Sequence, residues 1–210
     1  MIPYKPNIND PWVESILNRL NAEYEPIEIK VTPIKSAQEN DCFNIIQEKV
    51  NVNGGKMILG WQLWKSPFII EAECHAVWED KNENLWDFTP KANNARIILF
   101  VEDDQLVYEN KQINSIRMNI TNNGLVDHFI ETFNAKFRFL NKGEWAEIHD
   151  LTNIMNDFEK SMLSELYLAQ NGIALMLNNG GNLNSKCFCS SNRKYIECHG
   201  TNFIEMMKNY

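Results

Sequence analysis

The stretch Lys56-Met-Ile-Leu-Gly-Trp-Gln-Leu-Trp-Lys-Ser-Pro-Phe-Ile-Ile-Glu-Ala-Glu-Cys-His-Ala-Val-Trp78 decides the fold of this chain. Two runs rich in β-branched and aromatic residues flank a Lys-Ser-Pro turn, and this pattern predicts neighbouring strands. Alternation along the second run separates an apolar face from a face that carries Glu71, Glu73 and His75. Because the connection is so short, we expect the two strands to be antiparallel.

Helical patterns lie on both sides of the expected sheet. Asp10-Pro11 is typical of a helix start, and a second short helix is expected from Asp41 to Val50. Between them, Pro26 to Pro33 is expected to be an extended connector. After Gly124, two apolar stripes at helical spacing predict two helices, the second running to Gly172.

Four more short runs have the composition of strands, at residues 85–90, 96–101, 105–109 and 113–120. The expected fold class is α+β, an antiparallel sheet with N-terminal helices. The expected domains are residues 1–123 (α+β), residues 124–177 (a helical segment packed on that domain) and residues 183–210 (a small C-terminal module).

Composition restricts the class of protein. The chain has 210 residues, 20 of them basic and 28 acidic, so its net charge is −8, and 44% of the residues are hydrophobic. This hydrophobic content excludes disorder over most of the chain, and the acidic balance without a Lys/Arg cluster argues against nucleic-acid binding. We find neither a secretory signal nor an apolar run of about 18–20 residues, so no membrane span is expected. The five cysteines are then expected to be reduced or metal-bound in the cytoplasm.

Four potential metal ligands are crowded near the end of the chain. Cys187, Cys189, Cys198 and His199 supply three thiolates and one imidazole, the donors that tetrahedral zinc prefers. A segment this short cannot bury a core of its own, so metal coordination would supply its folding free energy. We therefore predict a structural Zn²⁺ site, with all four positions filled by protein. The alternative is a reduced, flexible cysteine tail.

The segment Cys187-Phe-Cys-Ser-Ser-Asn-Arg-Lys-Tyr-Ile-Glu-Cys-His-Gly200 resembles the SEC-C motif, the zinc tail of the bacterial preprotein-translocase motor and of many unrelated proteins. Ligand spacing, Lys194 and Tyr195 match the motif. The family usually has glycines where Ser190 and Asn192 stand, and serine adopts a left-handed backbone less readily than asparagine. The resemblance implies a docking surface for another protein.

A second constellation joins Cys42, His75 and Asp87. If Trp78 pairs with Asn84 in a hairpin, His75 lies opposite Asp87 on one face, close enough for the carboxylate to orient the imidazole. Cys42 stands where a helix begins, where the helix dipole favours a thiolate. The three residue types are those of a nucleophile, a general base and its orienter.

This trio resembles the transglutaminase-like branch of the papain-type cysteine enzymes. His75-Ala-Val-Trp-Glu79 and Trp86-Asp87-Phe-Thr-Pro90 are similar to the His and Asp blocks of that family. The resemblance covers residues 38–90. It implies a cysteine hydrolase or acyltransferase that acts on an amide or thioester without a cofactor.

Two other readings remain open at this point. In the first, the chain is a non-catalytic adaptor that holds a protein partner and docks through its zinc module. In the second, Glu71, Glu73, His75 and Asp87 bind a metal on the polar face of the sheet.

Overall fold

The computed structural model describes residues 2–35, 37–148, 151 and 153–210. These residues form two compact units. The sheet unit comprises residues 2–109 and 115–120, and the helical unit comprises residues 110–114 and 121–210. Within the described residues, no helix is long and apolar enough to cross a membrane.

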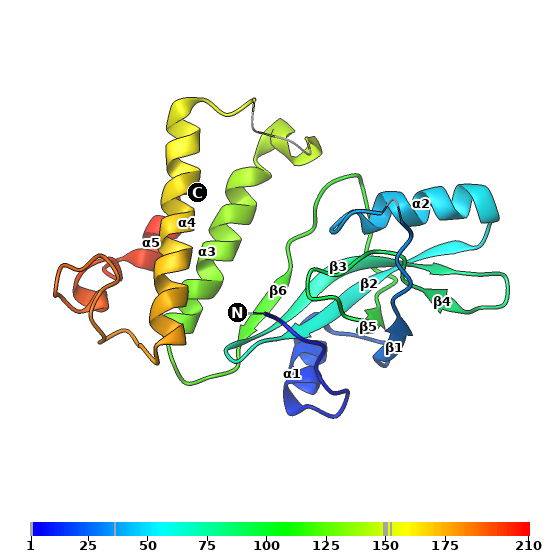
Figure 1. Ribbon diagram of the computed structural model, residues 1–210, viewed down its shortest axis with the longest axis horizontal. Helices are drawn as coiled ribbons and strands as arrows, with labels where there is room; N and C mark the ends of the chain where they lie inside the picture. Colours follow the sequence, from blue (N-terminus) through cyan, green and yellow to red (C-terminus); the bar gives the residue numbers. More distant parts are fainter. Residues whose placement is uncertain (1, 36, 149–150, 152) are drawn as a thin grey trace. The chain divides into compact units, whose positions relative to one another are not determined.

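The sheet unit is an α+β fold built on an antiparallel sheet (Figure 1). Its elements are α1 (Pro11–Leu20), β1 (Ile27–Lys30), α2 (Cys42–Asn53), β2 (Lys56–Lys65), β3 (Ile69–Glu79), β4 (Leu85–Trp86), β5 (Ile97–Glu102) and β6 (Ile116–Asn119). The strand order is β1-β5-β2-β3-β4, and β6 also pairs with β3. A parallel bridge from Val31 to Asp87 joins the chain after β1 to the chain after β4, so the sheet is nearly closed.

The predicted pair of central strands is confirmed. β2 and β3 pair without interruption from Lys56↔Glu79 to Lys65↔Ile70. Because no bulge breaks this ladder, side chains alternate strictly between the two faces. Val77 lies in one apolar cluster with Ile29, Val31, Trp64, Ile98 and Phe100. On the other face, Ala76 packs beneath α2 in a second cluster with Cys42, Ile45, Ile46 and Phe88.

Three sheet predictions are corrected. No strand covers residues 105–109: the Asp103 carbonyl accepts from the backbone N–H of Leu106, which turns the chain there. The expected connector contains β1, whose partner β5 lies far along the chain. β4 pairs Trp78 with Trp86, not with Asn84. A shift of two residues preserves the face of every side chain, because strands have a period of two.

The loop before β4 explains the observed register. The Asp80 carboxylate accepts hydrogen bonds from the backbone N–H groups of Asn82 and Asn84 and from the indole Nε1 of Trp86. Glu83 has a left-handed backbone with φ 64°. These contacts close a loop over residues 80–84, which starts one residue later than the loop that the Trp78–Asn84 pairing requires.

The helical unit contains α3 (Leu125–Leu140), the 3-10 turn η1 (Gly143–Glu147), α4 (Asp157–Asn178), the 3-10 turn η2 (Tyr195–Glu197) and α5 (Phe203–Met207). The second expected helix, with apolar positions from Trp145 onward, is interrupted. α4 begins only at Asp157, because Asn156 and Glu159 cap it reciprocally. Residues 149, 150 and 152 of that expected helix lie outside the described residues.

Candidate functional site

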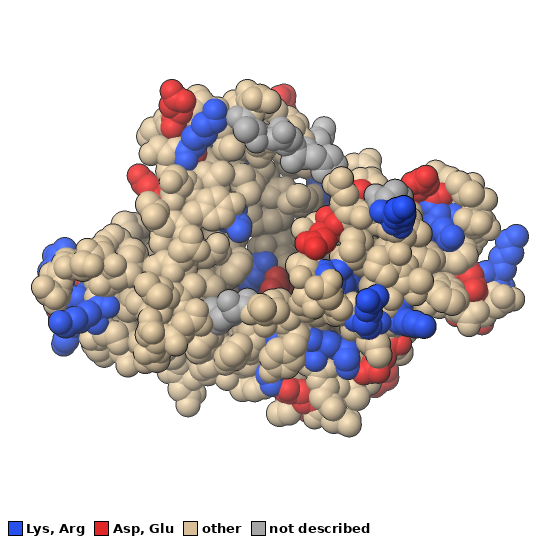
Figure 2. All heavy atoms as spheres, viewed as in Figure 1, with Lys and Arg blue, Asp and Glu red and all other residues tan. Residues whose placement is uncertain are grey.

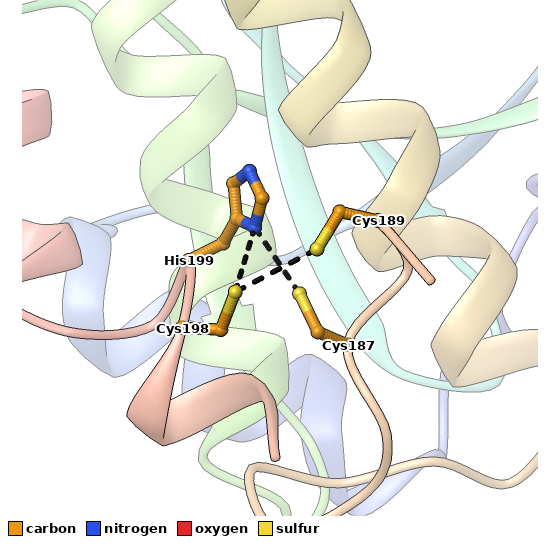
Figure 3. Close-up of side chains that lie close together, drawn as sticks. All are labelled: Cys187, Cys189, Cys198 and His199. Carbon is orange, nitrogen blue, oxygen red and sulfur yellow. Dashed lines mark hydrogen bonds between the residues drawn. The ribbon is translucent and has the colours of Figure 1, made fainter. Parts of the chain in front are cut away.

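The four predicted metal ligands come together in the helical unit (Figure 3). One ligand atom from each of Cys187, Cys189, Cys198 and His199 lies within 4.8 Å of the others. The imidazole Nδ1 of His199 is 3.2 Å from Cys187 Sγ and 3.5 Å from Cys198 Sγ. Cys189 Sγ lies 3.6 Å from Cys198 Sγ.

These separations fit a tetrahedral ion. With Zn–S bonds of about 2.3 Å and a Zn–N bond of about 2.0 Å, the edges of the tetrahedron are about 3.8 Å between sulfurs and about 3.5 Å between sulfur and nitrogen. The three distances are within a few tenths of an ångström of these values. A set of three thiolates and one imidazole is compatible with zinc.

The backbone around the ligands is shaped to present them. Cys187 N–H donates to the carbonyl of Arg193, 2.9 Å away, which closes the loop between the two ligand pairs. Within that loop Ser190 and Asn192 both have left-handed backbones, each with φ 61°. These are the positions that the sequence comparison with the motif singled out, so the loop has the geometry that glycine would favour.

Hydrogen bonds to sulfur favour thiolates in this loop. The hydroxyl and backbone N–H of Ser191 donate to Cys189, which lowers the pKa of that thiol to about 6. Cys198 Sγ accepts from the guanidinium Nη2 of Arg193 at 3.3 Å. Burial raises the pKa of Cys187, although the backbone N–H groups of Cys189 and His199 partly oppose this.

The knuckle, residues 186–200, is packed against the two long helices. Tyr195 is fully buried, and its hydroxyl lies 3.1 Å from Nδ1 of His128 on α3. The Phe188 ring occupies the space beside Gly172 on α4, where a Cβ would lie 2.5 Å from the ring. Gly200 is required for the same reason, since a Cβ there would lie 2.7 Å from the Tyr195 ring. The metal site is thus packed within the helical unit.

No family model, curated protein or solved structure matches the chain. Its function is therefore inferred from the arrangement of its own side chains.

The sheet unit contains a buried ion-pair cluster. His75 Nε2 lies 3.2 Å from Asp87 Oδ2, so these two residues do meet. Lys91 Nζ lies 2.7 Å from the same carboxylate oxygen and 3.2 Å from His75 Nε2. The side chains of all three are at most 6% exposed.

The cluster has a defined charge balance. Burial and the Lys91 ammonium each lower the pKa of His75, but the electrostatic interactions with Cys42 and Asp87 and the hydrogen bond to Asp87 outweigh them and raise it to about 9. Burial acts to raise the pKa of Asp87, whereas His75 and Lys91 hold it well below its usual range. The site therefore favours an imidazolium beside a carboxylate.

Cys42 is placed differently from these two residues. It begins α2, as expected, but it is 4% exposed and packs in the apolar cluster on the Ala76 face of β3. His75 leaves β3 on the opposite face, with Val77. Within the described residues, Cys42 Sγ makes no hydrogen bond to His75 or Asp87.

The carboxylates on the polar face of β3 already have partners. Glu71 pairs with Arg117 at 2.6 Å, and Glu73 accepts from Trp64 Nε1 at 2.8 Å. Across the described residues, the tail is the one group of His, Cys, Asp and Glu side chains that can hold a metal ion. The proposed metal site on the sheet face is therefore not supported.

Lys91 is the member of the ion-pair cluster that the sequence analysis missed. It stands four residues after Asp87, a spacing at which opposite charges often meet. This spacing was the one sequence signal that could have placed Lys91 beside Asp87. It is a weak signal, because a lysine at this spacing outside a helix is ordinarily exposed.

Proposed function

We propose that this chain is a zinc-binding protein whose knuckle resembles the SEC-C motif and docks the chain onto a protein partner in the cytoplasm. The observation that carries the proposal is the convergence of four ligand atoms within 4.8 Å. The supporting motif evidence is the ligand spacing, together with left-handed backbones where the motif has glycines.

A structural role suits this metal better than a catalytic one. Four protein ligands complete a tetrahedron and leave no position for a water molecule. The ligands also hold a loop whose buried anchors, Phe188 and Tyr195, pack on α4 and α3. The metal would therefore supply folding free energy.

The outward side of the knuckle supports a docking role. Ile196 is 38% exposed, although the neighbouring Tyr195 is fully buried. The charged side chains of Lys194 and Glu197 flank it and are more than half exposed. Ile196 and its charged neighbours are therefore the part of the knuckle surface on which the docking proposal is tested.

Metal content tests the first half of the proposal. We expect one equivalent of zinc per chain in the protein purified with zinc, and loss of that zinc in Cys198→Ala. Cys74→Ala removes a buried cysteine of the sheet unit and serves as the matched control, which should retain the metal. Equal zinc content in both variants would contradict the site.

Partner binding tests the second half. We expect Ile196→Asp to lose a protein that co-purifies with the full chain while it retains zinc. A partner that stays bound to Ile196→Asp would argue against docking through this surface. The same holds for a partner that is lost only from variants that have also lost their zinc.

A second candidate function is cysteine-dependent acyl transfer by Cys42, His75 and Asp87. The 3.2 Å ion pair between His75 and Asp87 favours it, because a carboxylate there orients the imidazole. Within the described residues, Nδ1 of His75 makes no hydrogen bond, which leaves it available to a thiol. In its neutral form His75 would accept the Cys42 proton, and the thiolate would attack an amide or thioester carbonyl.

Alkylation distinguishes the two functions. An enzyme requires that iodoacetamide label Cys42 faster than Cys74 near neutral pH, with this preference lost in His75→Ala. Slow and equal labelling of both buried thiols would eliminate the enzyme and leave the adaptor.

A further inference from the structure

We propose that Cys189 and Cys198 form a peroxide-sensitive pair whose oxidation to a disulfide releases the metal. This inference rests on the proposed zinc site and concerns its regulation. Its basis is the unequal exposure of the three metal-binding thiols, together with the 3.6 Å distance between Cys189 Sγ and Cys198 Sγ.

The three sulfurs differ in their access to solvent. Cys187 is 5% exposed and is paired with His199 Nδ1. Cys189 is exposed, and Cys198 is partly exposed. The two cysteines of the sheet unit, Cys42 and Cys74, are both buried. A small oxidant in solution therefore meets Cys189 first.

Cys198 is the sulfur positioned to react next. It lies 3.6 Å from Cys189 Sγ, and a disulfide bond of about 2.05 Å needs an approach of less than 2 Å. The Ser191 hydroxyl and the Arg193 guanidinium lie 3.4 Å and 3.3 Å from Cys198 Sγ, so both hold this sulfur in place beside Cys189. Figure 3 shows the two sulfurs facing each other from the two separate ligand pairs.

The reaction balances with hydrogen peroxide as the oxidant. The Cys189 thiolate attacks one peroxide oxygen, the O–O bond breaks, and protonation gives a sulfenic acid and water. The Cys198 thiolate then attacks the Cys189 sulfur, the S–S bond forms, and hydroxide leaves and takes up a proton as water. Two thiolates lose two electrons in total, and peroxide is reduced to two waters.

Metal release follows from the ligands that remain. After oxidation only Cys187 and His199 can donate to the ion, and two ligands hold zinc far more weakly than four. Because the disulfide joins one cysteine from each ligand pair, the reaction removes half of each pair. The anchors Phe188 and Tyr195 do not take part, so they stay packed on α4 and α3 while the metal leaves.

Titration of the zinc-loaded full chain with hydrogen peroxide tests the inference. We expect one zinc per chain to appear in a chromogenic chelator, together with one disulfide and the mass loss of two hydrogen atoms. Peptide mapping should place the bond between Cys189 and Cys198 and leave Cys187 free to alkylation. A thiol reductant and added zinc should reverse the change.

The double variant Cys42→Ala with Cys74→Ala is the matched control. It retains all four ligands, so its zinc release should follow the same peroxide dependence as the wild type. Zinc that stays bound after excess peroxide, or a bond mapped to Cys187, would overturn the inference while leaving the zinc site intact. A chain that never binds zinc would instead defeat the proposed function itself.

Discussion

Left-handed backbone at Ser190 shows how one residue can limit the stability of the metal loop. Both Ser190 and Asn192 have φ 61°, where a Cβ crowds the following carbonyl. Asparagine tolerates this conformation, and most non-glycine residues with positive φ in this chain are asparagines. Serine is the poorer fit.

Ser190→Gly should therefore stabilise the zinc-loaded helical unit by about 1 kcal/mol, because glycine has no Cβ to strain. Asn192→Gly should gain less. Denaturant unfolding of the zinc-loaded protein measures both. Asn184→Gly changes a residue without positive φ and should lower stability. Equal effects at positions 184 and 190 would show that strain at Ser190 is not the cause.

The four candidate metal ligands could be found from sequence because their spacing is local and their chemistry is distinctive. His75 and Asp87 could be matched because alternation along a strand fixes which side chains share a face. The prediction that they share a face did not depend on the exact pairing, since a shift of two residues preserves the face. The positions of Lys91 and Cys42 depend on how remote elements pack, which no local pattern encodes.

At the level of elements, α4 carries a glycine for a packing reason. In a free helix, Gly→Ala stabilises by about 1 kcal/mol. At Gly172 the new Cβ would lie 2.5 Å from the Phe188 ring.

We expect Gly172→Ala to destabilise the zinc-loaded protein by about 1–3 kcal/mol, because overpacking outweighs helix propensity. Thermal unfolding measures the change. Asn171→Ala, at the neighbouring exposed position of the same helix, should instead stabilise slightly. Stabilisation by both variants would mean that the knuckle does not pack on α4.

Elements with local signals were predicted well. α1 begins at Pro11, and the Asp10 carboxylate caps it by accepting from Trp12 N–H. α2 and the β2–β3 ladder were also expected. β1 was missed and a strand at residues 105–109 was wrongly expected, because a strand is defined by its partner. The partner of β1 lies about 70 residues away, beyond the reach of pattern arguments.

At the level of the whole molecule, all four candidate metal ligands lie in the helical unit. Chelation of zinc should lower the unfolding temperature of the helical unit and leave that of the sheet unit unchanged. The fluorescence of Trp145 follows unfolding of the helical unit, because the other five tryptophans belong to the sheet unit. Variants that retain only Trp145, or lack only Trp145, separate the two transitions. If chelation lowered the unfolding temperatures of both units equally, this prediction would be wrong.

The ion-pair cluster predicts how the sheet unit responds to pH. His75 has an ordinary pKa near 6.5, and the folded protein raises it to about 9. The stabilisation is fully present below pH 6.5 and is lost as pH rises through 9, a decrease on the order of 2–3 kcal/mol. Urea unfolding of the Trp145→Phe protein measures it. His75→Gln should abolish this slope, and an unchanged slope would assign it to other groups.

On the face shown in Figure 2, acidic and basic side chains of the sheet unit are interspersed. The expectation that the chain does not bind nucleic acid through phosphates rests on its net charge of −8. That expectation remains a prediction.

The near closure of the sheet has a kinetic consequence. β2 and β3 are joined by a tight turn, so their ladder can form early, whereas β1 must wait for β5 and then for the bridge from Val31 to Asp87. Contacts between such distant segments slow the search for the native state. In refolding followed by pulsed hydrogen exchange, amides of β2 and β3 should gain protection first, and those of β1 last.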